Sequence, residues 1–372
     1  MPDNKRILIT GNNGYIGSVM APWLQGQGFD VVGLDTGYFA PCTLVPDHTD
    51  VPTIHQDLRD VTASELAGFD AVIHLAALSN DPIGNLNEAW TREINSQGTI
   101  HLARLAKQAG VPRFIFSSSC IMYGTSEAAV VDETAPLAPR TEYARSKVEA
   151  EMALRALADE RFSPTFCRNG TVYGLSPRMR FDTVLNDFMG NAFTTGRIVI
   201  QSDGTPWRPV VHVQDVARAF QAVVEAPLET VHNEAFNIGA DQLNHQIRDL
   251  GQIAAAAVPG CELASVPHPG ADQRTYKADF AKFKRTFPAF SFRWTATDGA
   301  KELYAAFRKI GLTHGMFTDK RFTRLSWLRH LLDSGSIDET LKWTDLKANN
   351  SREGAHVSTG QEAERSGNPI DA

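Results

Sequence analysis

In the first half of the chain, short apolar runs alternate with longer segments in which apolar residues recur at helical spacing. The segments 90–108 and 143–157 predict helices, because their apolar residues fall on one face at a period near 3.6. Five shorter runs predict strands buried on both faces: 6–10, 30–34, 71–75, 113–117 and 164–168. Strands that alternate with helices form parallel units with right-handed crossovers. The predicted fold class is therefore α/β, with a doubly wound parallel sheet.

A glycine-rich turn follows the first predicted strand. The segment 7–17 reads ILITGNNGYIG, with glycines at Gly11, Gly14 and Gly17. Gly11 permits a tight turn, Gly14 lets the backbone approach a pyrophosphate, and Gly17 lets the next helix pack closely on the sheet. A helix that begins at Tyr15 presents free N–H groups and a positive dipole end to phosphates. This GxxGxxG has the strand–turn–helix context of a Rossmann dinucleotide site.

An acidic residue ends the next predicted strand. Asp35 lies about 18 residues after Gly17, where a carboxylate accepts hydrogen bonds from the adenosine ribose and repels a 2′-phosphate. The predicted cofactor is therefore NAD and not NADP. The other cofactor contacts expected from the turn and from the ends of later strands are Tyr15, Ile16, Asp57, Leu58, Leu75, Ala76, Ala77 and Ser117.

Two further segments carry candidate redox chemistry. FSSSCIMYG (116–124) lies at the end of the predicted strand 113–117, and YARSK (143–147) opens a predicted helix. Tyr143 and Lys147 are four residues apart and share one helical face. Moving a hydride to or from an alcohol carbon also moves the hydroxyl proton, and a tyrosine with a pKa of about 10 is a weak base at neutral pH. The Lys147 ammonium and a positive nicotinamide ring favour the tyrosinate, and Ser119 hydrogen-bonds the reacting oxygen.

The order of glycine loop, Asp35, serine triplet and YxxxK resembles the extended short-chain dehydrogenase/reductase family over residues 5 to 310. The resemblance implies that Ser119, Tyr143 and Lys147 form the catalytic triad, with NAD lying across the sheet and contacting the last two. It implies that Asn95 is a structural or cofactor-proximal residue. It also implies a homodimer that forms through the two helices near 90–108 and 143–158.

One segment points to a branch of that family. GTPWRPVVHVQDVA (204–217) resembles the G-x-x-x-R-x-x-x-H-V-x-D motif of nucleotide-sugar epimerases and dehydratases. By this match Arg208 binds the substrate pyrophosphate, which a planar guanidinium suits. In RNGTVYG (168–174), Thr171 stands where this group has asparagine. The other residues expected to contact a nucleotide-diphosphate sugar are Ser79, Ser119, Arg180 and Arg274.

The residues after the serine triplet help to distinguish between the reactions that this family catalyses. The family's sugar 4,6-dehydratases carry an Asp-Glu pair where this chain has Cys120 and Ile121. The pattern therefore favours an NAD-dependent epimerase that works through a transient keto intermediate, with Tyr143 as acid/base. A net dehydrogenase or 4-keto-sugar reductase stays open, while a dehydratase or a non-catalytic NAD-binding regulator is disfavoured. Cys120 is either a small buried hydrophobe or an acid/base beside the ketone.

The second half of the chain is less regular. We expect 1–173 to form the NAD-binding Rossmann domain, to which 206–261 return, and 174–205 with 262–345 to form a smaller C-terminal substrate-binding lobe. The polar tail 348–372 is predicted to be disordered, because it has almost no large apolar residues.

Composition limits the kinds of binding partner and indicates the cellular location. The chain of 372 residues has a net charge of −7, which argues against a nucleic acid or an anionic membrane as partner. Its 4 cysteines form no CxxC pair, so neither a metal site nor a disulfide framework is expected. The N-terminus has no apolar signal region and no segment has the length of a membrane span, so a cytoplasmic location is expected.

Overall fold

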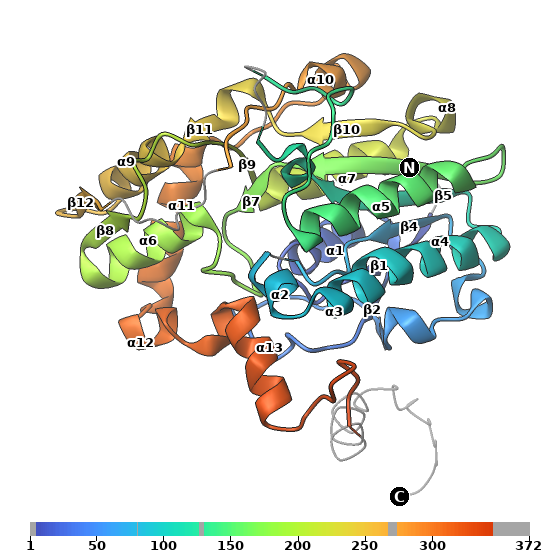
Figure 1. Cartoon of the computed structure of the whole chain (residues 1–372), viewed down its shortest axis with the longest axis horizontal. Coiled ribbons are helices and arrows are strands. Elements are labelled where there is room, and N and C mark those ends of the chain that lie inside the picture. Colours follow the sequence, from blue (N-terminus) through green and yellow to red (C-terminus); the bar gives the residue numbers. More distant parts are fainter. Residues whose placement is uncertain (1–4, 80, 126–129, 267–273, 345–372) are drawn as a thin grey trace, which may run out of the picture. The chain divides into compact units, whose positions relative to one another are not determined.

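A seven-stranded parallel sheet forms the centre of the computed structural model (Figure 1). In spatial order its strands are β10 (Ala235–Ile238), β6 (Ser163–Asn169), β5 (Arg113–Ser119), β4 (Ala71–His74), β1 (Arg6–Thr10), β2 (Asp30–Asp35) and β3 (Thr53–His55). The strand order changes direction between β1 and β4, which places a crevice at the carboxyl ends of these strands. The predicted doubly wound α/β fold of the Rossmann type is confirmed.

The structure describes residues 5–79, 81–125, 130–266 and 274–344. The tail predicted to be disordered, 348–372, lies outside these residues. The chain divides into two compact units, one up to Leu328 and one from Arg329 onward. In the described part of the chain, no helix is both long enough and apolar enough to cross a membrane.

All five predicted strands are present, with ends within two residues of those expected. Their interiors are almost completely buried; every residue of β4 and β6 is inaccessible or nearly so. Burial on both faces keeps each strand apolar throughout, which is why short runs without alternation predicted them.

Helices cover both faces of the sheet. On one face, α1 (Gly17–Gly26) packs against α7 (Val213–Glu225), and their apolar residues form one core with those of β1, β4 and β10. On the other face, α4 (Thr99–Gln108) packs against α5 (Glu142–Leu157). Figure 1 shows α4 and α5 in front of the strands and α1 and α7 behind them. The helix predicted at 143–157 is confirmed as α5.

The helix predicted at 90–108 is interrupted. It consists of α3 (Glu88–Thr91), a π-helical segment over Arg92–Gly98, and α4. The wider π-helical turn carries the buried Asn95, whose side chain is hydrogen-bonded to the backbone of Leu78. Such π-helical insertions often accompany functional sites.

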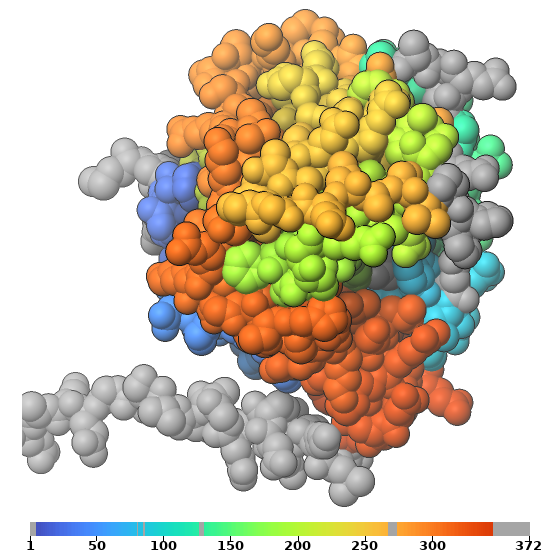
Figure 2. All heavy atoms as spheres, turned by 90° about the vertical axis from the view of Figure 1, so that its left-hand side faces the viewer, coloured from blue at the N-terminus to red at the C-terminus, as the bar shows by residue number. Residues whose placement is uncertain are grey.

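A second group of elements packs around its own apolar core. It includes a three-stranded sheet, β11 (Asn244–Gln246), β9 (Trp207–His212) and β7 (Thr171–Tyr173), and the pair β12 (Glu262–Ser265) and β8 (Arg197–Ile200). The remaining helices are α2 (Asp81–Leu86), α6 (Val184–Thr195), α8 (Leu228–Val231), α9 (Ile247–Ala257), α10 (Ala281–Thr286), α11 (Ala296–Ile310), α12 (His314–Phe317) and α13 (Arg324–Asp333). Figure 2 shows α6 and β8 beside α9 and β12 on one face.

This second core joins α6, α9 and α11 through buried residues such as Leu185, Leu250 and Leu303. Strand β10 lies at one edge of the large sheet, although it comes after β7–β9 in the chain. The division into a Rossmann domain and a substrate-binding lobe stays a prediction.

Candidate active site

One cavity of about 680 Å³ opens at the carboxyl ends of β1, β2, β4 and β5 and extends to β7, α6 and β9. Its size is in the range of sites for small molecules and cofactors. Of the residues predicted from the sequence, the following line it: Gly11, Gly14, Tyr15, Ile16, Gly17, Asp35, Asp57, Leu58, Leu75, Ala76, Ala77, Ser79, Ser117, Ser119, Tyr143, Thr171, Arg180, Arg208 and Arg274. Asn95 and Lys147 lie behind the wall of the cavity.

The glycine loop leaves no room for side chains at two positions. Gly11 has φ +76°, and a Cβ there would lie 2.7 Å from the backbone nitrogen of Ala76. A Cβ on Gly17 would lie 2.2 Å from the carbonyl oxygen of Gly11. Helix α1 begins at Gly17, two residues later than expected, and no side chain caps it. Its exposed first turn beside a bare backbone fits a bound pyrophosphate.

Asp35 lies at the end of β2 and is held by two backbone amides. Its Oδ1 accepts a hydrogen bond from Gly37 N at 2.7 Å, and its Oδ2 accepts one from Asn13 N at 3.1 Å. Burial raises the pKa of this carboxyl above its ordinary value, while the two amides lower it. The geometry fits a carboxylate that receives the ribose hydroxyls of NAD.

Asp57 lines the cavity as part of an ion pair. Its carboxylate forms an ion pair with Arg59, with a distance of 2.6 Å between Oδ2 and Nη2. It also accepts a hydrogen bond from the backbone nitrogen of Arg59. Asp57 thus lines the cavity with a carboxylate that already has a cationic partner.

Asn95 supports the cavity wall from behind. Its Oδ1 accepts a hydrogen bond from Leu78 N at 2.8 Å, and its Nδ2 donates one to Leu78 O at 3.0 Å. The side chain is 1% exposed. The structure therefore places it as a residue that fixes the segment 75–79, whose backbone lines the cavity.

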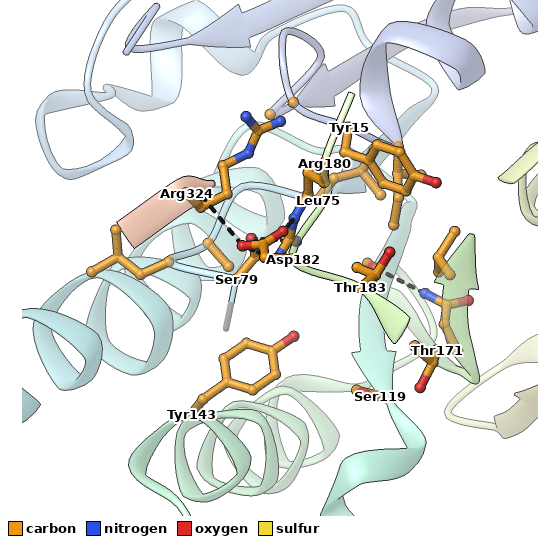
Figure 3. A pocket seen from close by; sticks show the side chains of 18 of the residues that line it. Tyr15, Leu75, Ser79, Ser119, Tyr143, Thr171, Arg180, Asp182, Thr183 and Arg324 are labelled. Carbon is orange, nitrogen blue, oxygen red and sulfur yellow. Dashed lines mark hydrogen bonds and ion pairs between the residues drawn. The ribbon is translucent and has the colours of Figure 1, made fainter. Parts of the chain in front are cut away.

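Tyr143 and Ser119 project into the cavity from neighbouring elements. Ser119 ends β5, and Tyr143 is the second residue of α5, whose start is capped by Thr141 through a hydrogen bond from Ala144 N. Figure 3 shows the Tyr143 hydroxyl directed into the cavity on the side where Ser119 and Thr171 lie. Two hydroxyls can thus face one reacting oxygen.

Lys147 lies one helical turn behind Tyr143 and is 3% exposed. Its Nζ donates a hydrogen bond to Ser117 O at 2.8 Å and lies 4.6 Å from the centre of the Phe116 ring. Burial lowers the pKa of Lys147 to about 7, which Glu151 partly opposes. Such a shifted lysine is typical of a functional site.

The pKa of Tyr143 differs from the expectation that Lys147 lowers it. Burial, followed by the charge of Asp81, raises the pKa of Tyr143 to about 12, while Arg180 acts to lower it. The protein groups alone therefore keep this phenol protonated at neutral pH.

The three arginines predicted to contact substrate form hydrogen bonds and ion pairs with other residues of the protein. Arg208 donates hydrogen bonds to the carbonyl oxygens of Trp207 and Arg274. Arg274 forms an ion pair with Asp81, with 2.6 Å between Nη1 and Oδ2. Arg180 pairs with Asp182 and donates a hydrogen bond to Ser79 Oγ at 3.1 Å. The two arginines predicted from the late segments, Arg208 and Arg274, are thus brought together.

Cys120 has no access to the cavity. It is completely buried, burial raises the pKa of its thiol, and its Sγ lies 3.1 Å from Arg168 O. Its neighbour Ile121 lines the cavity. Of the two interpretations of Cys120, the structure favours the small buried hydrophobe.

Several lining residues were not predicted. They are polar or charged side chains that no motif position marked: Asn169, Asp182, Thr183 and Arg324. Asn169 donates a hydrogen bond to Ser117 Oγ at 3.0 Å. Arg168–Gly174 was singled out in the sequence for Thr171, and its neighbour Asn169 was the nearest available signal.

The cavity joins a glycine loop, an acidic strand end and a Tyr–Ser pair, all of which lie within the part of the chain that a family model matches. The model of the NAD dependent epimerase/dehydratase family matches residues 7–239. The chain belongs to this family. The family's cofactor is NAD, and Gly11, Gly17 and Asp35 provide the bare backbone and the carboxylate that it requires.

Other members of the family resemble this chain over most of its length. A UDP-glucose 4-epimerase of Bacillus subtilis strain 168 is 28% identical over 330 residues, which cover 80% of this chain and 94% of that protein. Among solved structures, the NAD-dependent NDP-hexosamine 5,6-dehydratase TunA has a TM-score of 0.73 at 26% identity and covers 82% of this chain and 98% of its own. A UDP-glucose 4-epimerase of Thermotoga maritima, solved with UDP-glucose, has a TM-score of 0.69 at 25% identity and covers 82% and 100%. The chain is therefore an extended short-chain dehydrogenase/reductase enzyme.

Proposed function

We propose that this enzyme is an NAD-dependent epimerase of a nucleotide-diphosphate sugar, with Tyr143 as the acid/base and a transient keto sugar as intermediate. One observation carries the proposal: Tyr143, Ser119, the glycine loop and two arginines line a single cavity, while the positions of a dehydratase acid pair are Cys120 and Ile121. The two relatives named above as 4-epimerases, one of them a solved structure, agree with this choice.

We assign binding of the substrate diphosphate to the part of the cavity that Arg208 and Arg274 line. Arg208 is 8% exposed, and its guanidinium is fixed by the carbonyl oxygens of Trp207 and Arg274. A fixed, planar guanidinium loses little freedom when it binds a phosphate, and its geometry matches two phosphate oxygens. We therefore assign the diphosphate of the substrate to Arg208 and Arg274, with the sugar directed at Tyr143.

The reaction requires a proton carrier. NAD, when bound, supplies the hydride acceptor for the sugar carbon and a positive ring that favours the tyrosinate. Tyr143 Oη then takes the proton of the sugar hydroxyl and returns it after the keto sugar has presented its other face. Ser119 donates a hydrogen bond to the same oxygen, and Lys147, anchored on Ser117 O, keeps a cationic group behind the phenol.

A net dehydrogenase or 4-keto-sugar reductase uses the same residues, so only the balance of cofactor separates it from an epimerase. For elimination, a carboxylic acid must reach the sugar. Asp81 lines the cavity, but Arg274 and Thr141 each hold it at 2.6 Å. Both carboxylate oxygens of Asp81 are thus occupied by other protein groups, which favours a positioning role over direct contact with the sugar.

The Y143F variant tests the role of the phenol. We expect kcat to fall by about 10²- to 10⁴-fold, the usual contribution of one acid/base group, while NAD stays bound. Y304F is the matched control, because Tyr304 of α11 packs on Phe193 of α6 and does not line the cavity. Turnover by Y143F within a few-fold of the wild type would refute the proposal.

The quaternary structure belongs to the proposal too. Helices α4 and α5, which pack together on one face of the sheet, are the elements proposed to meet their copies in a homodimer. Met152 of α5 is 67% exposed, as expected of an apolar side chain at such a contact. Sedimentation of the wild type and of M152E tests this assignment: a dimer that the charge weakens supports it.

A further inference from the structure

Arg324, the first residue of α13, lines the cavity with a buried charge. It is 2% exposed, its Nη2 donates a hydrogen bond to Arg178 O at 2.9 Å, and its Cζ lies 4.3 Å from the centre of the Phe39 ring. In the described part of the chain its Nη1 has no hydrogen-bond partner. A buried, charged N–H without an acceptor is costly, so a group aimed into a cavity in this way points to a ligand.

The segment that carries Arg324 is fixed at both sides of the cavity. On one side, Phe181 N donates a hydrogen bond to Phe322 O at 3.0 Å, and Arg324 N donates one to Asp182 Oδ2 at 3.3 Å. On the other side, Trp327 Nε1 donates a hydrogen bond to Tyr38 O at 2.6 Å. The guanidinium is therefore held in place before any ligand arrives, which reduces the entropy lost on binding.

The charge around Arg324 favours an anion. The neighbouring carboxylate of Asp182 is already taken by Arg180, whose Nε and Nη2 donate to its two oxygens at 2.8 and 3.2 Å. Figure 3 shows Asp182 beside both arginines. Only the backbone nitrogen of Arg324 bonds to this carboxylate, so among the described contacts its guanidinium has no acidic partner of its own. Burial and the charge of Arg180 lower the pKa of Arg324 to about 10, so it stays protonated at neutral pH.

The position of Arg324 indicates which anion. Its guanidinium packs on the Phe39 ring, and Trp327 of the same helix bonds to Tyr38 O. Tyr38 and Phe39 follow Asp35 at the end of β2, and they line the same cavity as Asp35 and the glycine loop. Of the two, the glycine loop is the pyrophosphate site and Asp35 is the ribose site. A guanidinium on the loop after Asp35, in the cavity that the glycine loop also lines, is placed where the pyrophosphate of NAD meets its adenosine.

We propose that Arg324 is a second anchor for the cofactor pyrophosphate, in addition to the glycine loop and the start of α1. The residue lies outside the segment 7–239 that matches the family model, so the family match does not supply it. The inference rests on the NAD site of the proposed function and not on its sugar chemistry. A second anchor slows the loss of NAD, which suits an enzyme that returns its cofactor to the starting state in each turnover.

The test is calorimetric titration of the full-length protein, freed of bound nucleotide, with adenosine, ADP and adenosine 2′,5′-bisphosphate. We expect R324Q to bind ADP about 10- to 100-fold more weakly, as for loss of a charge-assisted hydrogen bond, and adenosine within about 2-fold of the wild type. R324K keeps the positive charge but loses the planar guanidinium, so its ADP affinity should lie between those of the wild type and R324Q. R321Q is the matched control, because Arg321 pairs with Asp319 outside the cavity and should leave ADP affinity unchanged.

Thermal unfolding of each variant separates a folding defect from a binding defect. If R324Q does not fold, R324K decides: its ADP affinity must be below that of the wild type. Equal ADP affinity in a folded R324Q or R324K would overturn the assignment, as would equal losses for adenosine and ADP. A loss confined to the 2′,5′-bisphosphate would place the anchor at a 2′-phosphate instead. Failure of the wild type to bind ADP at all would contradict the NAD site itself, and with it the proposed function.

Discussion

The Nζ atom of Lys147 lies 5.8 Å from the centre of the Tyr143 ring, while its hydrogen bond goes to the carbonyl oxygen of Ser117. Lysine and tyrosine are thus close without a direct hydrogen bond between them. An effect of Lys147 on the phenol would therefore be electrostatic, and its own pKa of about 7 means that this charge is partly lost near neutral pH. The pH dependence of turnover should reflect both groups.

K147M should raise the pKa of Tyr143 in the working enzyme, because a positive charge near the phenol is removed. A base acts only when deprotonated, so the rise of kcat with pH should move upward by about one to two pH units. At pH 7 we expect kcat to fall by about 10- to 100-fold, with partial recovery at pH 9. K147R, which keeps the charge, should lie closer to the wild-type profile. An unchanged profile in K147M would show that Lys147 has no electrostatic role.

Replacement of Asp35 should change the choice of cofactor. D35S removes the carboxylate that meets the ribose hydroxyls, so NAD affinity should fall by about 10- to 100-fold. The loss of repulsion should leave NADP affinity unchanged or improved. Titration with NAD and NADP measures both. If NAD and NADP weaken by the same factor, the ribose contact has been assigned to the wrong residue.

Gly17 should tolerate no side chain. A Cβ there meets the Gly11 carbonyl oxygen at 2.2 Å, and backbone at that distance has to move. We expect G17A to lower the free energy of unfolding by about 2–3 kcal/mol, as overpacking does, and to release NAD. G26A in the same helix is the control, because its Cβ would meet nothing within 4 Å. Urea unfolding compares them, and equal stabilities of the two variants would contradict the close packing of α1.

His74 should make the protein sensitive to acid. It is completely buried between Thr10 and Thr99, whose hydroxyls lie 2.6 and 2.8 Å from its Nδ1 and Nε2. Burial, followed by the charge of Lys147, lowers the pKa of His74 to about 3. Between pH 6.5 and 3 the unfolded chain therefore binds a proton that the native chain does not, so stability falls as the pH falls.

From pH 7.5 to 5 this single group should remove about 2 kcal/mol of stability. The H74Q variant loses the hydrogen bonds of the imidazole ring, and it also has no group at this position that takes up a proton in this pH range. The difference in free energy of unfolding between wild type and H74Q should therefore shrink by the same amount over that interval, as measured by urea unfolding at both pH values. A difference that stays constant would mean that the pKa of His74 is the same in the native and unfolded states.

The parts of the site that lie within a few consecutive residues could be predicted from the sequence. In the glycine loop and in YARSK, local geometry alone places the backbone or the two side chains, so Gly11, Gly17 and Tyr143 line the cavity as expected. The strands could be predicted because burial on both faces makes each of them a short, continuous apolar run. The place of Asp35 in the site could be predicted because it ends the second predicted strand, which lies beside the first.

The rest depends on contacts between distant segments. Arg324 meets Asp182 across 142 positions of the chain, and neither belongs to a motif. The ion pair of Asp57 with Arg59 and the hydrogen bonds of Asn95 to Leu78 decide whether those polar groups face a ligand or the protein. The raised pKa of Tyr143 is caused by burial, which the sequence does not quantify.

The most direct test of the central claim is a cofactor balance on the purified wild-type protein, without added nucleotide. Bound small molecules are released by acid and identified by mass, and the intact protein is then given UDP-, GDP-, dTDP- and CDP-sugars while NADH absorbance and sugar products are followed together. We predict that NAD is released, that one of these sugars is converted to an isomer of equal mass, that net NADH stays constant, and that Y143F does not perform the conversion. Steady net production or consumption of NADH, or a product lighter by one water, would contradict the assignment as an epimerase.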